Sequence, residues 1–152
     1  MNKLLAAVMG WCVVAGSTAF AADQRGTADE AVAMVNKAAA YLNVNGKDKS
    51  FAEFSNPVGQ FVHGDLYITV YDMNGTCLSH GFNKKMVGKN MIDLKDVDGK
   101  PFVKERSDLA KTKDTFWVEY KYVNPLTKGI EKKAQYTRKV GDVLICCGIY
   151  KS

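Results

Sequence analysis

Apolar residues near the start of the chain recur with the spacing of a helix that buries one face. They stand at Ala31, Val35, Ala38 and Leu42. Thr27 and Glu30 form the capping-box pattern in which a helix begins, and Gly46 is the type of residue that commonly follows its last turn. The sequence therefore predicts a long helix over about residues 28–44. A second, short helix is predicted around Phe51 and Phe54.

From residue 66 the pattern changes to the alternation of a strand. Leu66, Ile68 and Val70 alternate with Tyr67, Thr69 and Tyr71. Asn74-Gly75 is the pair best suited to a two-residue hairpin turn, so a return strand is expected from Cys77 to His80. The two tyrosines share one face of the first strand, and the histidine ends the second. This ribbon could therefore supply part of a polar pocket.

Three further strands are predicted over residues 115–123, 130–140 and 143–150. The last is nearly all apolar, which suits the middle of a sheet. A short helix is expected from Pro101 to about Lys113. The predicted fold class is thus α+β: a five-stranded antiparallel sheet, with the long N-terminal helix on one face and loops plus a short helix over the other.

The first residues have the features of a secretory signal. Lys3 precedes an apolar run, and Ala19-Phe20-Ala21 fits a signal-peptidase site. A retained anchor is less favoured, because the run is shorter than the ~20 residues that span a bilayer. A lipoprotein is less favoured because Trp11 is too large for the position before a lipidated Cys12. We expect a signal peptide at 1–21, a single domain at 22–152, and a periplasmic or secreted protein.

Charge and composition exclude several classes of function. Removal of residues 1–21 lowers the net charge from +5 to +4 by the loss of Lys3, and the basic residues form no concentrated stripe, so nucleic acid is not expected as a partner. There are 2 histidines, and we find no Gly-x-Ser-x-Gly elbow and no Cys-x-x-Cys pair. The sequence therefore predicts no enzyme, no cofactor and no metal. Adjacent Cys146 and Cys147 should point to opposite faces, and a bond from Cys77 to one of them stays open.

Several short motifs together resemble those of single Cache domains of the second subtype. The ribbon contributes Tyr71-Asp-x-x-Gly75, His80 and Val87-Gly-Lys-Asn90. Further along the chain are Asp98-Gly-Lys-Pro-Phe102, Trp117-Val-Glu-Tyr120, Asn124-Pro125, Lys133-x-x-Tyr136 and Cys147-Gly-Ile-Tyr150. The resemblance covers about residues 23–151. These domains are extracytoplasmic sensor modules of bacterial chemoreceptors and kinases, so the resemblance implies a PAS-like fold that binds a small organic ligand, commonly a short carboxylate.

A carboxylate removed from water needs hydrogen-bond donors, and charged donors are the most effective. The candidate donors are His80, Tyr120, Lys121, Lys133 and Tyr136. The candidate walls are Tyr67, Tyr71 and Trp117. Trp117 and Tyr120 are separated by an odd number of positions, so a regular strand places them on opposite faces. Lys133 could instead be a solvated surface residue, and the aromatic residues could be ordinary core.

Two functions remain in view. The first is a sensor domain for a small carboxylate. Because family members usually continue into a transmembrane helix and a signalling module, whereas this sequence ends at Ser152, we expect a separate membrane receptor or kinase as partner. The second is an envelope interaction module in which the pocket has been lost. A pocket filled by Tyr67, Tyr71 and Trp117 would favour the second.

Overall fold

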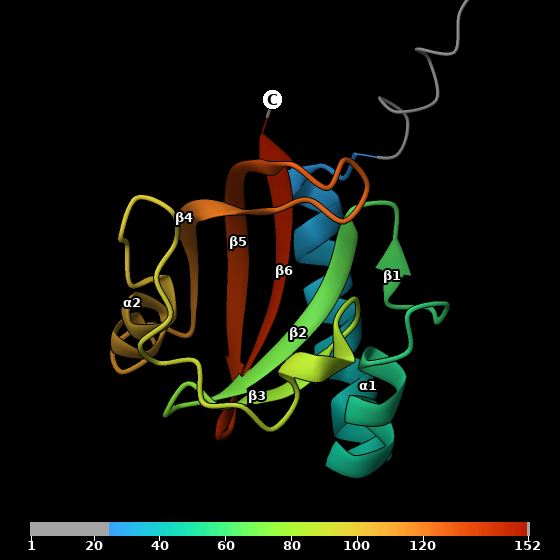
Figure 1. The fold of residues 1–152 in the computed structure, drawn as a ribbon. Helices are drawn as coiled ribbons and strands as arrows, with labels where there is room; N and C mark the ends of the chain where they lie inside the picture. Colours follow the sequence, from blue (N-terminus) through green and yellow to red (C-terminus); the bar gives the residue numbers. More distant parts are fainter. Residues whose placement is uncertain (1–24, 152) are drawn as a thin grey trace, which may run out of the picture.

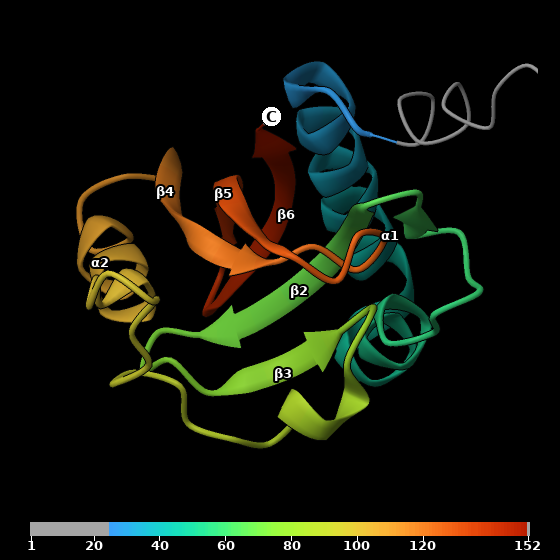
Figure 2. The same cartoon turned by 45° about the horizontal axis from the view of Figure 1, so that its top comes forward.

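The computed structural model describes residues 25–151. The predicted signal peptide, residues 1–21, lies outside this range. Figure 1 shows a long helix along one side of a twisted sheet and a short helix beside the far strand. The start of the long helix, the C-terminal end of the last strand and the connection between β4 and β5 lie at the same end of the domain (Figures 1 and 2).

The long helix, α1 (Ala28–Phe54), begins at the predicted capping box. The Thr27 hydroxyl accepts from the backbone N–H of Glu30 at 3.3 Å, and the Glu30 carboxylate accepts from the backbone N–H of Thr27 at 2.8 Å. Gly46 interrupts α1 with a non-helical backbone, φ +73° and ψ 173°, so the predicted first helix ends there and a second helical segment follows across a kink. Glycine adopts this backbone conformation without strain, and the second segment follows the first without a loop between them.

Within residues 25–151 the sheet has six strands, and all pairs are antiparallel. They are β1 (Val62–His63), β2 (Leu66–Asp72), β3 (Cys77–His80), β4 (Thr115–Val123), β5 (Ile130–Val140) and β6 (Val143–Lys151). Their order is β1-β2-β6-β5-β4, and β3 pairs with β2. The predicted α+β class and antiparallel sheet are confirmed, with β6 inside the sheet as expected. The two-residue strand β1 was not predicted.

The β2–β3 connection differs from the predicted two-residue turn. β2 ends at Asp72 and β3 begins at Cys77, and the Asp72 N–H donates to the carbonyl of Thr76 at 3.0 Å. The Asp72 carboxylate accepts from the N–H groups of Asn74 and Thr76 at 2.9 and 2.8 Å. This side chain stabilises a longer loop, and Gly75 supplies the positive φ of +85° that the loop requires.

The two faces of the sheet bury different side chains. On one face, α1 packs against alternate residues of β2 and β6, including Ile68, Val70 and Ile145. On the other, α2 (Phe102–Leu109) and the loop before it cover Tyr71, Leu144 and other residues of the opposite parity. Figure 2 shows α2 beside β4, at the far side of the sheet from α1. This second face holds the candidate site.

The free edge of β4 is covered by side chains of the loop before α2. The Lys100 ammonium donates to the backbone carbonyl of Glu119. The Asp96 carboxylate accepts from the backbone N–H of Lys121 at 2.9 Å. The outward backbone groups at the centre of this strand are thus hydrogen-bonded without a further strand.

The three cysteines of the described range are free and buried. Cys77 lies on β3 and the other two on β6, with β2 between these strands, so the open question of a bond to Cys77 is answered against it. None of the helices in residues 25–151 has the length and apolar character that crossing a bilayer requires.

Candidate functional site

The sheet face covered by α2 contains an unusual number of buried polar side chains. Because residues two apart on a strand share a face, β5 directs Lys133, Gln135 and Thr137 to this side. Thr69 of β2 is buried on the same side, where it bonds Gln135 at 3.3 Å. Buried polar groups need partners, so this layer can be read hydrogen bond by hydrogen bond.

Lys133 is the first of two buried cations in this layer of the described structure, and only 2% of its surface is exposed. Its ammonium donates to the hydroxyls of Tyr67 and Tyr150, at 2.8 and 3.1 Å. It also lies 4.3 and 4.6 Å from the centroids of the same two rings. Among residues 25–151, no carboxylate oxygen lies within 4.0 Å of it. Burial therefore lowers the pKa of Lys133 to about 7.

Gly148 makes room for the Lys133 side chain. The two residues lie on neighbouring strands, where Gln135 of β5 pairs with Gly148 of β6. A Cβ atom at position 148 would lie 2.3 Å from Cε of Lys133, which is a severe overlap. The glycine thus lets the lysine stem lie flat over β6 and reach both tyrosines. In the sequence, this glycine was noted only as part of the Cys147-Gly-Ile-Tyr150 motif.

His80 lies beside Tyr67 and Lys133, and its imidazole ring is neutral. Its Nδ1 accepts from the backbone N–H groups of Phe82 and Asn83, at 3.2 and 2.9 Å, so the neutral ring carries its proton on Nε2. The ring stacks on Tyr67, with centroids 5.2 Å apart. Burial, together with the nearby charge of Lys133, lowers the pKa of His80 to about 4. His80 therefore offers an N–H donor at neutral pH.

A pocket of about 290 Å³ opens beside Tyr67 and His80. It is lined by Tyr67, His80, Phe82, Asn83, Tyr122, Val123, Pro125 and Lys128. At its rim the Lys128 ammonium lies 5.0 Å from the centroid of Phe82. The Tyr67 hydroxyl connects the pocket to Lys133. Its volume is at the small end of the range for ligand pockets, so it suits a small molecule.

Arg106 is a second buried cation, and sequence reasoning missed it. It lies on α2, is fully buried, and donates through Nη2 to the side-chain oxygen of Gln135. Its guanidinium carbon lies 4.6 Å from the centroid of Tyr71. In the described structure, its Nε and Nη1 atoms have no hydrogen-bond partner. The one signal available in the sequence was its position four residues after Phe102, on the buried face of the predicted helix.

Comparison with protein families identifies the chain. The family profile described as single Cache domain 2 matches residues 23–152, which is most of the sequence. The chain belongs to the single Cache domain 2 family. This match confirms the family that the sequence motifs suggested. Cache domains are extracytoplasmic sensory modules. A search of curated proteins finds no significant match.

Solved structures show the same Cache fold at low sequence identity. A methyl-accepting chemotaxis protein from Vibrio parahaemolyticus RIMD 2210633 has a TM-score of 0.68 and 23% identity, over 80% of this chain and 86% of that one. A Cache chemosensory domain, described in terms of carboxylic acid recognition, has a TM-score of 0.68 and 19% identity, over 82% and 92%. A periplasmic sensor domain of a chemotaxis protein has a TM-score of 0.63 and 17% identity, over 82% and 90%.

In this Cache domain, five of the eight sequence-predicted site residues share the α2 side of the sheet. They are Tyr67, Tyr71, His80, Tyr120 and Lys133. Tyr120 stacks on Phe102 with centroids 4.0 Å apart, so it forms the wall under α2. Tyr71 packs against the guanidinium of Arg106.

The structure does not bring the other three predicted residues to this side. Trp117 pairs with Tyr136 across β4 and β5, and their rings lie 5.3 Å apart on the face of the sheet that α1 covers in part. Lys121 has the parity of Trp117, and its ammonium pairs with Asp98 at 2.8 Å. Each is an odd number of positions from Tyr120 or Lys133, and strand alternation separates them. They are therefore excluded from the site.

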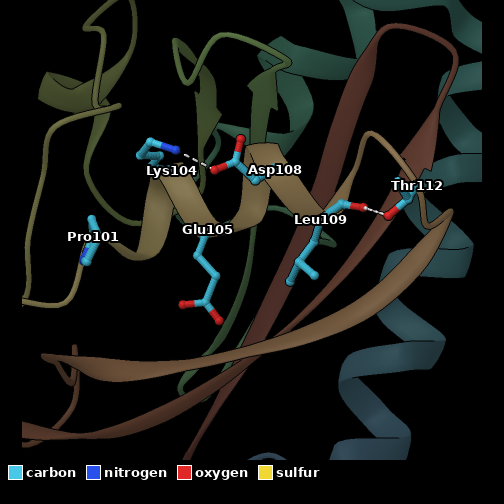
Figure 3. Close-up of a pocket in the computed structure, with 6 residues that line it drawn as sticks. All are labelled: Pro101, Lys104, Glu105, Asp108, Leu109 and Thr112. Carbon is cyan, nitrogen blue, oxygen red and sulfur yellow. Dashed lines mark hydrogen bonds and ion pairs between the residues drawn. The ribbon is translucent and has the colours of Figure 1, made fainter.

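Figure 3 shows a different hollow, on the outer surface of α2. Lys104, Glu105 and Asp108 line it, together with Pro101, Leu109 and Thr112. Here the charges have partners: Lys104 pairs with Asp108, and Lys100 pairs with Glu105 at 3.0 Å. In residues 25–151, no group of three or more His, Cys, Asp or Glu side chains has the arrangement of a metal site. The buried layer under α2, and not this surface hollow, is the candidate site.

Proposed function

We propose that this Cache domain binds a short organic carboxylate in the pocket beside Lys133. One observation carries the proposal: a buried ammonium with two hydroxyl partners and no carboxylate partner in the described chain, next to an open pocket. A charge removed from water is costly unless it is paired. A ligand carboxylate beside the Lys133 ammonium would supply the missing counter-charge.

The surrounding groups fit such a ligand. The Nε2–H of His80 and the hydroxyl of Tyr67 can donate to carboxylate oxygens, whereas the hydroxyl proton of Tyr150 is donated to the carbonyl of Val123. Phe82 and Tyr122 provide apolar walls for a short carbon chain. The structural relative described in terms of carboxylic acid recognition supports the same class of ligand.

We further propose that the domain is exported and passes its signal to a separate membrane receptor or kinase. The pocket rim includes Pro125 and Lys128 of the β4–β5 connection. Glu131, at the start of β5, accepts from Asn124 and Thr127 of this connection at 3.1 and 2.6 Å. The same carboxylate pairs with Arg25 at 2.9 Å. A change at the rim is thereby linked to the segment that precedes α1.

A thermal-shift screen of the purified protein against acetate, propionate, pyruvate and lactate tests the binding step, with matched alcohols and amines as controls. A ligand at 100 times its dissociation constant adds about 2.7 kcal/mol of stability, which is a readable shift. Calorimetry then compares Lys133→Met with Lys132→Met, a change at an exposed neighbour. We expect the first variant to lose binding and the second to keep it. If carboxylates shift the protein no more than alcohols, the carboxylate proposal is wrong and the envelope interaction module is the better function.

A further inference from the structure

Arg106 is not used by the proposed function, although it lies in the same buried layer as Lys133. An arginine side chain stays charged in proteins, so a full positive charge is held in this layer. In the described range, no carboxylate oxygen lies within 4.0 Å of it. Within residues 25–151 its Nε and Nη1 have no hydrogen-bond partner, while Nη2 donates to Gln135 and the guanidinium lies over the rings of Tyr71 and Phe102.

The charged neighbours of Arg106 on α2 behave differently. Lys104 and Asp108 pair with each other at the surface, and Glu105 pairs with Lys100 at 3.0 Å. These acidic groups therefore point away from the buried layer. Arg106 and Lys133 thus share an interior region in which, among the described residues, their hydrogen-bond partners are all neutral; the buried carboxylate of Asp65 acts on Lys133 only from beyond 4.0 Å.

The two cations are connected through one strand. Gln135 accepts from Arg106, and its amide nitrogen donates to the Thr69 hydroxyl at 3.3 Å. Gln135 and Lys133 are two positions apart on β5 and face the same side, a separation of about 7 Å along the strand. Lys133 and the partner of Arg106 therefore belong to one short stretch of β5, and a molecule with two acidic groups is the kind of ligand that would pair with both cations.

We infer that the ligand of this domain carries two acidic groups, one beside Lys133 and one at the open donors of Arg106, and that it is a short dicarboxylate. The inference rests on the proposed function and narrows its ligand class. A monocarboxylate neutralises one buried cation and leaves the other unpaired. A dicarboxylate neutralises both, and a planar guanidinium with open N–H donors is well suited to one of its carboxylates.

Calorimetry of the purified protein at pH 6.5 with acids of matched chain length tests this inference. The pairs are malonate with propionate, succinate with butyrate, and glutarate with valerate. We expect at least one dicarboxylate to bind ten times or more tightly than its matched monocarboxylate. Inorganic phosphate, whose charges share one centre, should bind more weakly than that dicarboxylate.

Variants assign the preference to Arg106. Arg106→Gln should weaken binding of the preferred dicarboxylate at least tenfold and change the affinity of the matched monocarboxylate less than twofold. Lys104→Gln, on the outer face of the same helix, should change neither. Arg106→Lys keeps the charge and should retain part of the preference, which keeps the test informative if Arg106→Gln does not fold.

Three results would overturn the inference. They are equal binding of the two acids of every pair by the wild-type protein, an equal loss of both in Arg106→Gln, and binding of phosphate as tight as that of the best dicarboxylate. Binding of monocarboxylates alone would overturn this inference and leave the proposed function standing. Absence of binding by either class would overturn both.

Discussion

Replacing Lys133 by methionine should stabilise the unliganded protein. Methionine keeps the unbranched stem and removes the ammonium that lacks a carboxylate partner in the described structure. Tyr150 keeps its hydrogen bond to the carbonyl of Val123 at 2.7 Å, and its hydroxyl stays 3.4 Å from that of Tyr67. The substitution therefore leaves the hydroxyls of Tyr67 and Tyr150 within reach of hydrogen-bond partners other than Lys133.

The magnitude follows from the pKa of the lysine. Burial lowers it from 10.5 to about 7. At about 1.4 kcal/mol per pKa unit, this difference corresponds to about 5 kcal/mol of destabilisation. The full effect is present below pH 7, where Lys133 is charged in the folded and the unfolded protein. Between pH 7 and 10.5 the unfolded chain binds more protons, so the stability of the wild-type protein rises with pH.

Urea unfolding followed by circular dichroism measures the effect. We expect Lys133→Met to raise the free energy of unfolding by about 3–5 kcal/mol at pH 6 and by about 1–2 kcal/mol at pH 9.5. Lys132→Met, at an exposed position of the same strand, should change it by less than about 0.5 kcal/mol at both pH values. A gain that does not depend on pH, or a loss of stability at pH 6, would refute the reasoning.

Three further predictions concern the same site. His80 should remain neutral at pH 5.5, because its pKa lies at about 4; NMR of the imidazole nitrogens checks this, and a midpoint near 6.5 would contradict it. At pH 8 the binding of a carboxylate should take up close to one proton by Lys133, whose pKa is about 7 in the free protein, and at pH 6 almost none; calorimetry in buffers of different ionisation enthalpy measures the number. Gly148→Ala should weaken carboxylate binding at least tenfold, because the new Cβ would lie 2.3 Å from Cε of Lys133, whereas Gly129→Ala, with only a 3.6 Å contact, should bind as the wild type.

Local signals predicted most of the fold. The capping box of Thr27 and Glu30 marks the true start of α1, and the apolar sequence of β6 correctly indicated an interior strand. The predicted end of the first helical segment at Gly46 agrees with its non-helical backbone, but the sequence did not show that the second segment follows without a loop. That arrangement depends on the packing of the residues that follow, including Phe54 in the core between α1 and the sheet.

The candidate site was predicted less completely, for two physical reasons. Residues an odd number of positions apart on a strand lie on opposite faces, and we applied this rule to Trp117 and Tyr120. The rule also separates Tyr136 from Lys133, although the motif suggested that Tyr136 and Lys133 both contact the ligand. Arg106 was missed because it follows Lys104 and Glu105, and such a charged run is typical of a solvated helix surface. Only the phase of the helix relative to the sheet shows that this one charge points inward.

The side chains on the edge of β4 bear on how the protein behaves at high concentration. An exposed edge strand is a template on which a second molecule can add its own strand. Here Asp96 and Lys100 already occupy the hydrogen-bonding groups at Lys121 and Glu119, and a newcomer would have to displace a charged side chain at each of them. The loop before α2 therefore protects this edge of the sheet against intermolecular strand addition, which is one common route to aggregation.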